Sequence, residues 1–205
     1  MSSSISYITF CANYSLKGNK APRGVHPHFL YKDGNSTNPH SQRTPYLAKA
    51  IKKNSKHFTA ITDTLADVSK IVCDLIRKHL PDVHDKLRVF CEILPLNHRP
   101  ATYPFPGFVL NIQVCTDGHV DEKDDTICVV IPFGDCKGGE LVLHEVGLVL
   151  ELKEGDILIF PSYRITHFNL HFTGVRCSVV MHSDRDVKSW NTNRNGWDGH
   201  IAFRK

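Results

Sequence analysis

Two stretches of the chain carry the residues around which the fold is organised. Residues 111–121 read NIQVCTDGHVD, and residues 161–178 read PSYRITHFNLHFTGVRCS. His119 and Asp121 are two positions apart, so on an extended backbone their side chains leave from the same face of a strand or of its end. His167 lies forty-eight residues further on, in another strand-like run. We therefore expect these three side chains to converge across a small β barrel.

The chemistry of the three side chains favours a metal ion. Two imidazoles and one carboxylate form the facial triad that selects non-haem Fe(II) and leaves coordination positions open. The competing interpretation of His119 and Asp121 is a hydrogen-bonded surface turn. His171 competes with His167, because a spacing of four puts both on one strand face. Only five residues separate His171 from Arg176, too few for the rest of a strand, a turn and a return, so His167 is preferred.

Arg176 and Ser178 form a second candidate group, suited to an anion. Arg176 follows His167 by nine residues, enough for a strand end, a turn at Gly174 and the start of an antiparallel neighbour. Its planar guanidinium matches a carboxylate, and Ser178 faces the same side two positions on. The alternative is that Arg176 pairs with a structural carboxylate such as Asp156.

His144 and Asn111 are further polar residues of this region. His144 follows a glycine turn and either fills a strand position or orients a metal ligand from behind. Asn111 is on the strand that leads into His119, where it either contacts a bound molecule or is a plain sheet residue.

Length and composition predict one domain over residues 1–205. A hydrophobic content of 41% is ordinary for a globular protein. No apolar run has the length of a bilayer span, and residues 1–5 lack the basic start and long apolar segment of a secretion signal. The seven cysteines are scattered singly and odd in number, which is typical of reduced thiols. We expect an intracellular protein, nuclear or cytoplasmic, with no membrane partner.

Hydrophobic periodicity divides the chain near residue 100. Residues 5–12 alternate as a strand, and residues 15–45 form a long irregular segment. Spacings of three and four predict helices in residues 45–54 and 57–80, with an interruption at Pro81. After residue 100 come short apolar runs at 107–115, 126–133, 140–144, 147–152, 156–160, 165–170 and 174–181.

These elements predict an α+β fold. Seven or eight short strands separated by glycine and proline turns are typical of a double-sheet jelly roll, or double-stranded β-helix. We place this core at residues 101–182, with N-terminal supporting helices in residues 1–100 and a C-terminal tail at 183–205. The chain has no glycine-rich phosphate-binding motif, which speaks against a nucleotide cofactor or a kinase.

Charge is distributed unevenly along the chain. Residues 1–100 hold fifteen Lys and Arg against seven Asp and Glu, and the remainder holds ten against fourteen. A basic first half either faces phosphate or is a solvated helical surface, and the second interpretation is preferred because no compact basic run occurs. In the tail, basic and aromatic residues alternate in a way that suits base stacking or anchors the terminus. They are Arg185, Lys188, Trp190, Arg194 and Trp197.

Together, these motifs resemble the Fe(II)/2-oxoglutarate-dependent dioxygenases, over roughly residues 105–182. The pattern is especially similar to compact fungal members of the TET/J-binding-protein group. It consists of Asn111-x-Gln113, His119-x-Asp121, Phe133-Gly134, Gly138-Gly139-Glu140-Leu141, Gly155-Asp156-Ile157-Leu158-Ile159-Phe160, Ser162, His167 and Gly174-x-Arg176-x-Ser178. The resemblance implies Fe(II), 2-oxoglutarate and O2 as requirements.

The resemblance also implies roles for single residues. His119, Asp121 and His167 would hold the iron, and Arg176 and Ser178 would hold the distal carboxylate of 2-oxoglutarate. Asn111 would contact the cosubstrate or the substrate.

The TET/J-binding-protein group oxidises methylated bases in nucleic acid, so DNA or RNA carrying 5-methylcytosine or N6-methyladenine is the expected partner. Asp124 and His182 are candidate substrate contacts, although a solvated acid near a turn also explains Asp124. The chain lacks the cysteine-rich domain with which the animal enzymes hold DNA. A protein or small-molecule hydroxylase with the same mechanism therefore stays open, as does a cupin-like binding protein with a vestigial triad.

Overall fold

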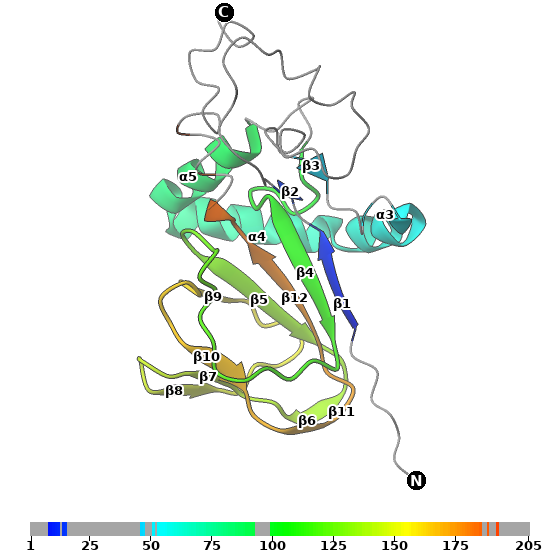
Figure 1. The fold of residues 1–205 in the computed structure, drawn as a ribbon, viewed down its shortest axis with the longest axis vertical. Helices are drawn as coiled ribbons and strands as arrows, with labels where there is room; N and C mark the ends of the chain where they lie inside the picture. The colour runs from blue at the N-terminus through cyan, green and yellow to red at the C-terminus, as the bar shows by residue number, and fades with distance from the viewer. Residues whose placement is uncertain are drawn as a thin grey trace, which may run out of the picture.

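The fold is built on a five-stranded antiparallel sheet, with helices on one face and smaller sheets on the other (Figure 1). The computed structural model describes residues 8–12, 14–15, 46–47, 51, 53–92, 99–185, 188 and 192. Apart from Ser15, the predicted irregular segment 15–45 lies outside the described residues. The tail residues Trp190, Arg194 and Trp197 lie outside them as well.

Three helices precede the main run of strands. They are α3 (Ser55–Thr64), α4 (Ala66–His79) and α5 (Pro81–Glu92). The strands before and after them are β1 (Ile8–Ala12), β2 (Tyr14–Ser15), β3 (Tyr46–Leu47), β4 (Gly107–Ile112), β5 (Cys128–Phe133), β6 (Cys136–Gly138), β7 (Leu141–Leu143), β8 (Leu148–Leu150), β9 (Leu158–Phe160), β10 (His167–Asn169), β11 (Phe172–Gly174) and β12 (Cys177–His182).

The helices bury the apolar stripe that the sequence predicts. Val72 and Ile76 of α4 and Leu87 of α5 are fully buried, at the spacing of one helix face. Pro81 is the first residue of α5, a position where its missing N–H costs no helical hydrogen bond. The predicted single helix over 57–80 is wrong in one respect, because a turn at Leu65 separates α3 from α4.

The order of the large sheet is β1-β4-β12-β5-β9, and alternate residues of its strands face two different cores. In β5, Val129 and Ile131 pack with the helices, whereas Cys128 and Val130 pack with β7 and β9 on the other side. A strand that is buried on both faces has no polar alternation. This is why residues 128–131 read CVVI.

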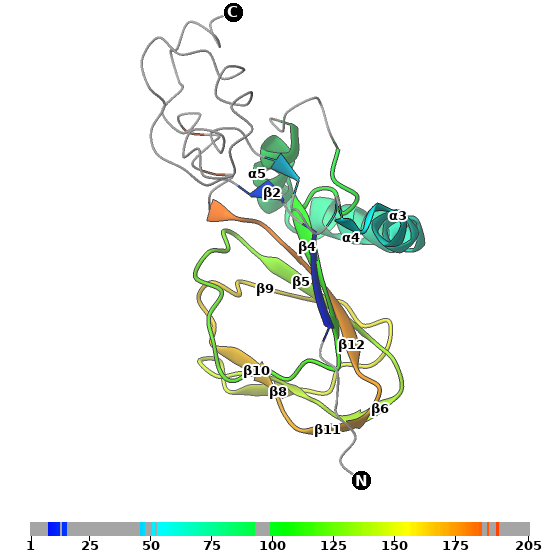
Figure 2. The same ribbon diagram turned by 45° about the vertical axis from the view of Figure 1, so that its right-hand side comes forward.

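Two smaller sheets complete the β region, with strand orders β10-β7-β8 and β11-β6. They lie across from the large sheet (Figure 2), and Leu141 and Leu143 of β7 share a buried cluster with Phe160 of β9. The predicted α+β class is confirmed. Strand β6 was not predicted, and its partner β11 lies where a turn at Gly174 was predicted. Residues 46–47 form strand β3, paired with β2, where the periodicity predicted a helix. Within the described residues, every helix falls short of the length and hydropathy that crossing a bilayer requires.

Candidate metal centre and anion pocket

A cavity of about 340 Å³ lies between the large sheet and the smaller sheets. Its walls are Val109, Asn111, Val114, Thr116, His119, Asp121, Asp124, Cys128, Val130, Leu141, His167, Asn169, Arg176, Ser178, Val180 and His182. All eight site residues singled out from the sequence are among them. On β12, Ser178, Val180 and His182 line the cavity, whereas Val179 and Met181 pack toward the helices, as the period of two requires.

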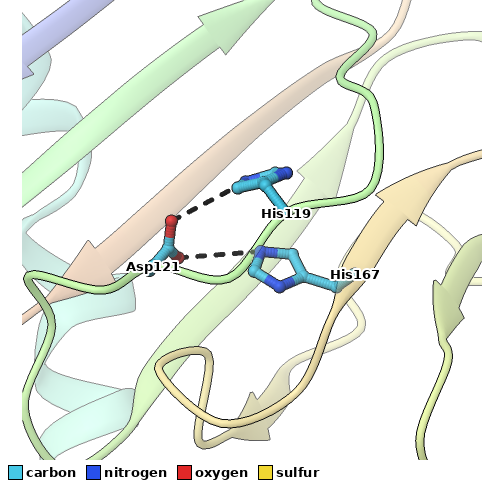
Figure 3. A group of neighbouring side chains, drawn as sticks. All are labelled: His119, Asp121 and His167. Atoms are coloured by element: carbon cyan, nitrogen blue, oxygen red, sulfur yellow. Dashed lines mark ion pairs between the residues drawn. The ribbon is translucent and has the colours of Figure 1, made fainter.

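The two histidines of the predicted triad are brought together by backbone pairing. His119 and His167 form an isolated antiparallel bridge, in which each backbone N–H donates to the other residue's carbonyl, at 3.2 and 2.9 Å. Their rings lie 4.5 Å apart. The backbone N–H of Asp121 donates to the carbonyl of Ser162 at 3.1 Å. Figure 3 shows the three side chains turned toward one another from these two segments.

Hydrogen bonds fix which nitrogen of each imidazole faces the aspartate. Nδ1 of His119 lies 2.8 Å from the carbonyl oxygen of Asp117, and Nδ1 of His167 lies 2.9 Å from that of Ile165. A carbonyl only accepts, so Nδ1 carries the proton in both rings. In the neutral rings, both Nε2 lone pairs are therefore free to bind a metal ion, an arrangement that metal-binding histidines generally show.

The distances between the three side chains fit an ion. Their ligand atoms all lie within 4.8 Å of one another. Nε2 of His119 is 3.7 Å from one carboxylate oxygen of Asp121, and Nε2 of His167 is 3.6 Å from the other. These gaps are too long for hydrogen bonds. Ligands that bind an ion at about 2.1 Å and at right angles stand roughly 3 Å apart, so a small shift closes the group around a metal.

Arg176 supplies a buried positive charge to the same cavity. It is 7% exposed, and burial lowers the pKa of its guanidinium from the ordinary value. Among the described residues, no carboxylate lies within ion-pair distance of it. The pairing with Asp156 does not occur, because Asp156 is exposed and accepts a hydrogen bond from the backbone of Lys153 at 2.7 Å. The cation is thus left facing the cavity, beside Ser178.

The competing histidines lie outside this cavity. His171 is exposed on the link between β10 and β11, and His144 is exposed just after β7. Neither is among the residues that line the cavity. Asn111 does line it, and it stands directly opposite Ser178 in the pairing of β4 with β12.

Asp124 and His182 form a buried polar pair in the cavity wall. Asp124 is 8% exposed, so it is not the solvated acid that the sequence allowed. Its carboxylate accepts a hydrogen bond from the hydroxyl of Ser162 at 2.9 Å and lies 3.2 Å from Nδ1 of His182. That contact lacks the alignment of a hydrogen bond, and neither ring nitrogen of His182 has a hydrogen-bond partner among the described residues.

The pKa of His182 is raised above its ordinary value. Burial, the largest single cause, lowers the pKa, but the contact with Asp124 and the negative charges of Asp124, Asp184 and Asp121 together raise it further than burial lowers it. The imidazolium is therefore the favoured form of this side chain at a pH where an exposed histidine is already neutral.

This raised pKa predicts how stability depends on pH. Because the folded pKa of His182 exceeds the unfolded value of 6.5, its contribution is complete below pH 6.5 and is lost as the pH rises through the folded value. Urea unfolding over a pH series should show this fall in the wild type. Asp124→Asn removes the carboxylate charge and should flatten the fall; an unchanged slope in the variant would contradict the assignment.

Two residues of this region were missed as parts of the site. Asn169 is two positions after His167 on β10 and lines the cavity with it, and the period of two could have identified it. Gln113 contacts the backbone of Arg176. The sequence gives no signal for that contact, because it depends on a left-handed backbone at Gln113, with a φ of 57°.

No protein-family model and no curated protein matches this chain. Among solved structures, it is similar to one described as NgTET1 in complex with 5mC DNA. The TM-score is 0.60 at 14% sequence identity, over 88% of this chain and 62% of that one. A 2OG-Fe(II) oxygenase family oxidoreductase from Burkholderia pseudomallei matches 40% of this chain and 44% of its own, with 21% identity and a TM-score of 0.35.

The likeness to NgTET1 confirms the predicted resemblance at the level of the fold. The chain shares the fold of that TET protein. It spans less than two thirds of the length of the TET protein that it matches.

Proposed function

We propose that this protein is an Fe(II)/2-oxoglutarate-dependent dioxygenase. One observation carries the proposal: three side chains that could hold a metal ion share a cavity with a buried guanidinium that has no carboxylate partner among the described residues. A metal triad alone would suit many binding proteins. The buried guanidinium of Arg176 in addition favours the binding of a small anion beside the metal. The large sheet and the smaller sheets across from it are then the two sides of a double-stranded β-helix.

In this proposal His119, Asp121 and His167 hold Fe(II), and Arg176 and Ser178 hold the distal carboxylate of 2-oxoglutarate. The fit of the triad supports the first part, because both Nε2 atoms already face the carboxylate of Asp121. When bound, Fe(II) with 2-oxoglutarate and O2 supplies the oxidation of a C–H bond. The chain itself contributes orientation, because a guanidinium and a hydroxyl that fix one end of the cosubstrate determine where its other end lies.

Part of the cavity wall is apolar. Val109, Val130, Leu141 and Val180 give it apolar sides, and Val130 and Leu141 are themselves buried. Apolar walls lower the local dielectric constant and so strengthen the electrostatic contacts of Arg176.

We infer that the substrate is a methylated base in DNA or RNA. The likeness to NgTET1 in complex with 5mC DNA supports this class. Asp124 accepts from the exocyclic amine of cytosine or adenine, and the imidazole of His182 supplies the second polar contact. Their place in the cavity wall and their burial support these roles, because a buried carboxylate discriminates strongly between a donor and a group that cannot donate.

The test is reconstitution of the protein under anaerobic conditions with Fe(II) and 2-oxoglutarate, followed by addition of O2. A panel of oligonucleotides carrying 5-methylcytosine or N6-methyladenine is then examined by mass spectrometry for a gain of oxygen. Release of succinate without oxygen gain in any oligonucleotide would redirect the proposal to a protein or small-molecule substrate. Absence of Fe(II)-dependent succinate would leave a cupin-like binding protein.

Asp124→Asn separates substrate selection from the iron chemistry. The amide keeps the size of the side chain but replaces one acceptor with a donor, so oxidation of the preferred oligonucleotide should fall by roughly tenfold to a hundredfold. Succinate release without substrate should be unchanged. Loss of bound iron from the variant, measured by elemental analysis, would instead count against the role of Asp124 as a substrate contact.

A further inference from the structure

We propose that Gln113 and Gly139 are positioning residues, which set the guanidinium of Arg176 for a dicarboxylate before any ligand arrives. The inference rests on the proposed function, since it concerns the binding of 2-oxoglutarate. It assigns roles to two residues that contact neither the triad nor, in this arrangement, the reacting atoms.

Gln113 fixes the backbone at Arg176 from one residue beyond the end of β4. Its backbone N–H donates to the carbonyl of Arg176 at 2.8 Å, and its side-chain Oε1 accepts from the backbone N–H of Arg176 at 2.6 Å. Its Nε2 donates to the carbonyl of Gly174 at 3.0 Å. Three hydrogen bonds thus tie one residue to the segment that leads into β12, where regular pairing of the two strands has stopped.

The backbone of Gln113 is strained, which indicates that the contacts of this residue hold it in place. Its φ of 57° lies in the left-handed region, which residues other than glycine rarely adopt and which persists only where the surroundings over-determine it. A glycine would adopt this φ freely but would lose both side-chain hydrogen bonds. The chain keeps the strained conformation together with the amide that reaches Arg176.

Gly139 leaves room for the stem of Arg176. A Cβ at this position would lie 2.9 Å from Cδ and 3.0 Å from Nε of Arg176, and 3.2 Å from Cβ of Phe172. The backbone of Gly139 cannot move aside easily, because its N–H donates to the carbonyl of His171 at 3.0 Å and its carbonyl accepts from Nδ2 of Asn169 at 3.1 Å.

Together these contacts hold Arg176 at both ends. Gln113 fixes its backbone, Gly139 borders the Cδ–Nε part of its side chain, and the ring of Phe172 lies 5.8 Å from its Cζ. An arginine otherwise loses considerable rotamer freedom when it grips a ligand. Because that freedom is already restricted, the diacid should bind more tightly than it would to a mobile arginine.

The test compares binding of two probes to Zn(II)-loaded protein by calorimetric titration. N-oxalylglycine carries a distal carboxylate, whereas oxamate has the metal-binding end alone. In Gln113→Asn, a side chain that tolerates a positive φ but is shorter, and in Gly139→Ala, N-oxalylglycine should bind roughly tenfold to a hundredfold more weakly. Oxamate affinity should be unchanged. This split between the probes separates positioning of Arg176 from a general structural defect.

Gly155→Ala is the matched control. Gly155 has a φ of +90°, close to the +78° of Gly139, but a Cβ there meets nothing within 4 Å. The control therefore carries the same kind of backbone strain without the clash, and it should bind both probes like the wild type. Thermal unfolding of each variant reports whether it folds. If Gly139→Ala does not fold, the binding data for Gln113→Asn alone decide the test.

Three outcomes overturn different claims. If the wild type does not bind N-oxalylglycine, the proposed function fails. If the wild type binds it and the folded variants bind it equally well, the positioning roles are wrong. If the variants lose affinity for both probes equally, the residues support the site as a whole and the inference about Arg176 is wrong.

Discussion

Replacing His119 by alanine is expected to reduce Fe(II)-dependent succinate release by about a hundredfold or more, because a direct metal ligand should matter at least as much as the groups that orient it. His167 and Asp121 would remain, but two ligands hold Fe(II) too weakly to keep it in place. The loss should appear both as succinate formed at high 2-oxoglutarate and as iron retained after gel filtration.

His171→Ala provides the matched control for that experiment. It removes the same imidazole four residues after His167, from an exposed position that does not line the cavity. We expect wild-type succinate release and iron content. A His119→Ala protein that keeps its iron and its activity would show that the metal is held elsewhere, and the proposed triad would then be wrong.

The sequence could predict which side chains share a face, because the period of a strand is two. This rule places Ser178 and His182 on the cavity side of β12. Periodicity does not give the pairing between segments distant in the chain, however. The bridge between His119 and His167, which brings the two imidazoles together, joins the first residue of β10 to a residue that lies outside every named strand. The nine-residue spacing from His167 to Arg176 predicted that their strands are antiparallel neighbours, and this is wrong, because β10 and β12 lie in different sheets.

The features that the sequence could not reveal have similar physical causes. The turn at Leu65 is marked by neither glycine nor proline, so the apolar spacing runs through it without a break. The sequence left two interpretations of Asp124 open, a solvated acid and a substrate contact. Nothing in the surrounding residues reveals that Ser162 and His182 cover its carboxylate. The left-handed backbone at Gln113 could not be predicted either, because a glutamine residue gives no sign of a positive φ.

Replacing Arg176 by methionine should greatly weaken binding of the diacid and, at the same time, stabilise the ligand-free protein. The wild-type guanidinium is buried with no carboxylate partner among the described residues, so its desolvation is uncompensated until an anion binds. Methionine keeps an unbranched stem beside Phe172 without the charge. We expect the free energy of unfolding to rise by roughly 1–3 kcal/mol and N-oxalylglycine binding to weaken by about a hundredfold or more.

Thermal unfolding with and without N-oxalylglycine measures both effects on Zn(II)-loaded protein. The ligand should raise the midpoint of the wild type, because it binds only the folded state, and should leave that of Arg176→Met nearly unchanged. Arg164→Met is the control, since Arg164 is exposed and its Cζ lies 5.1 Å from the ring of Tyr163; it should change neither midpoint. A less stable Arg176→Met protein would mean that the guanidinium is already satisfied in the folded chain, and a site poised for an anion would then have no basis.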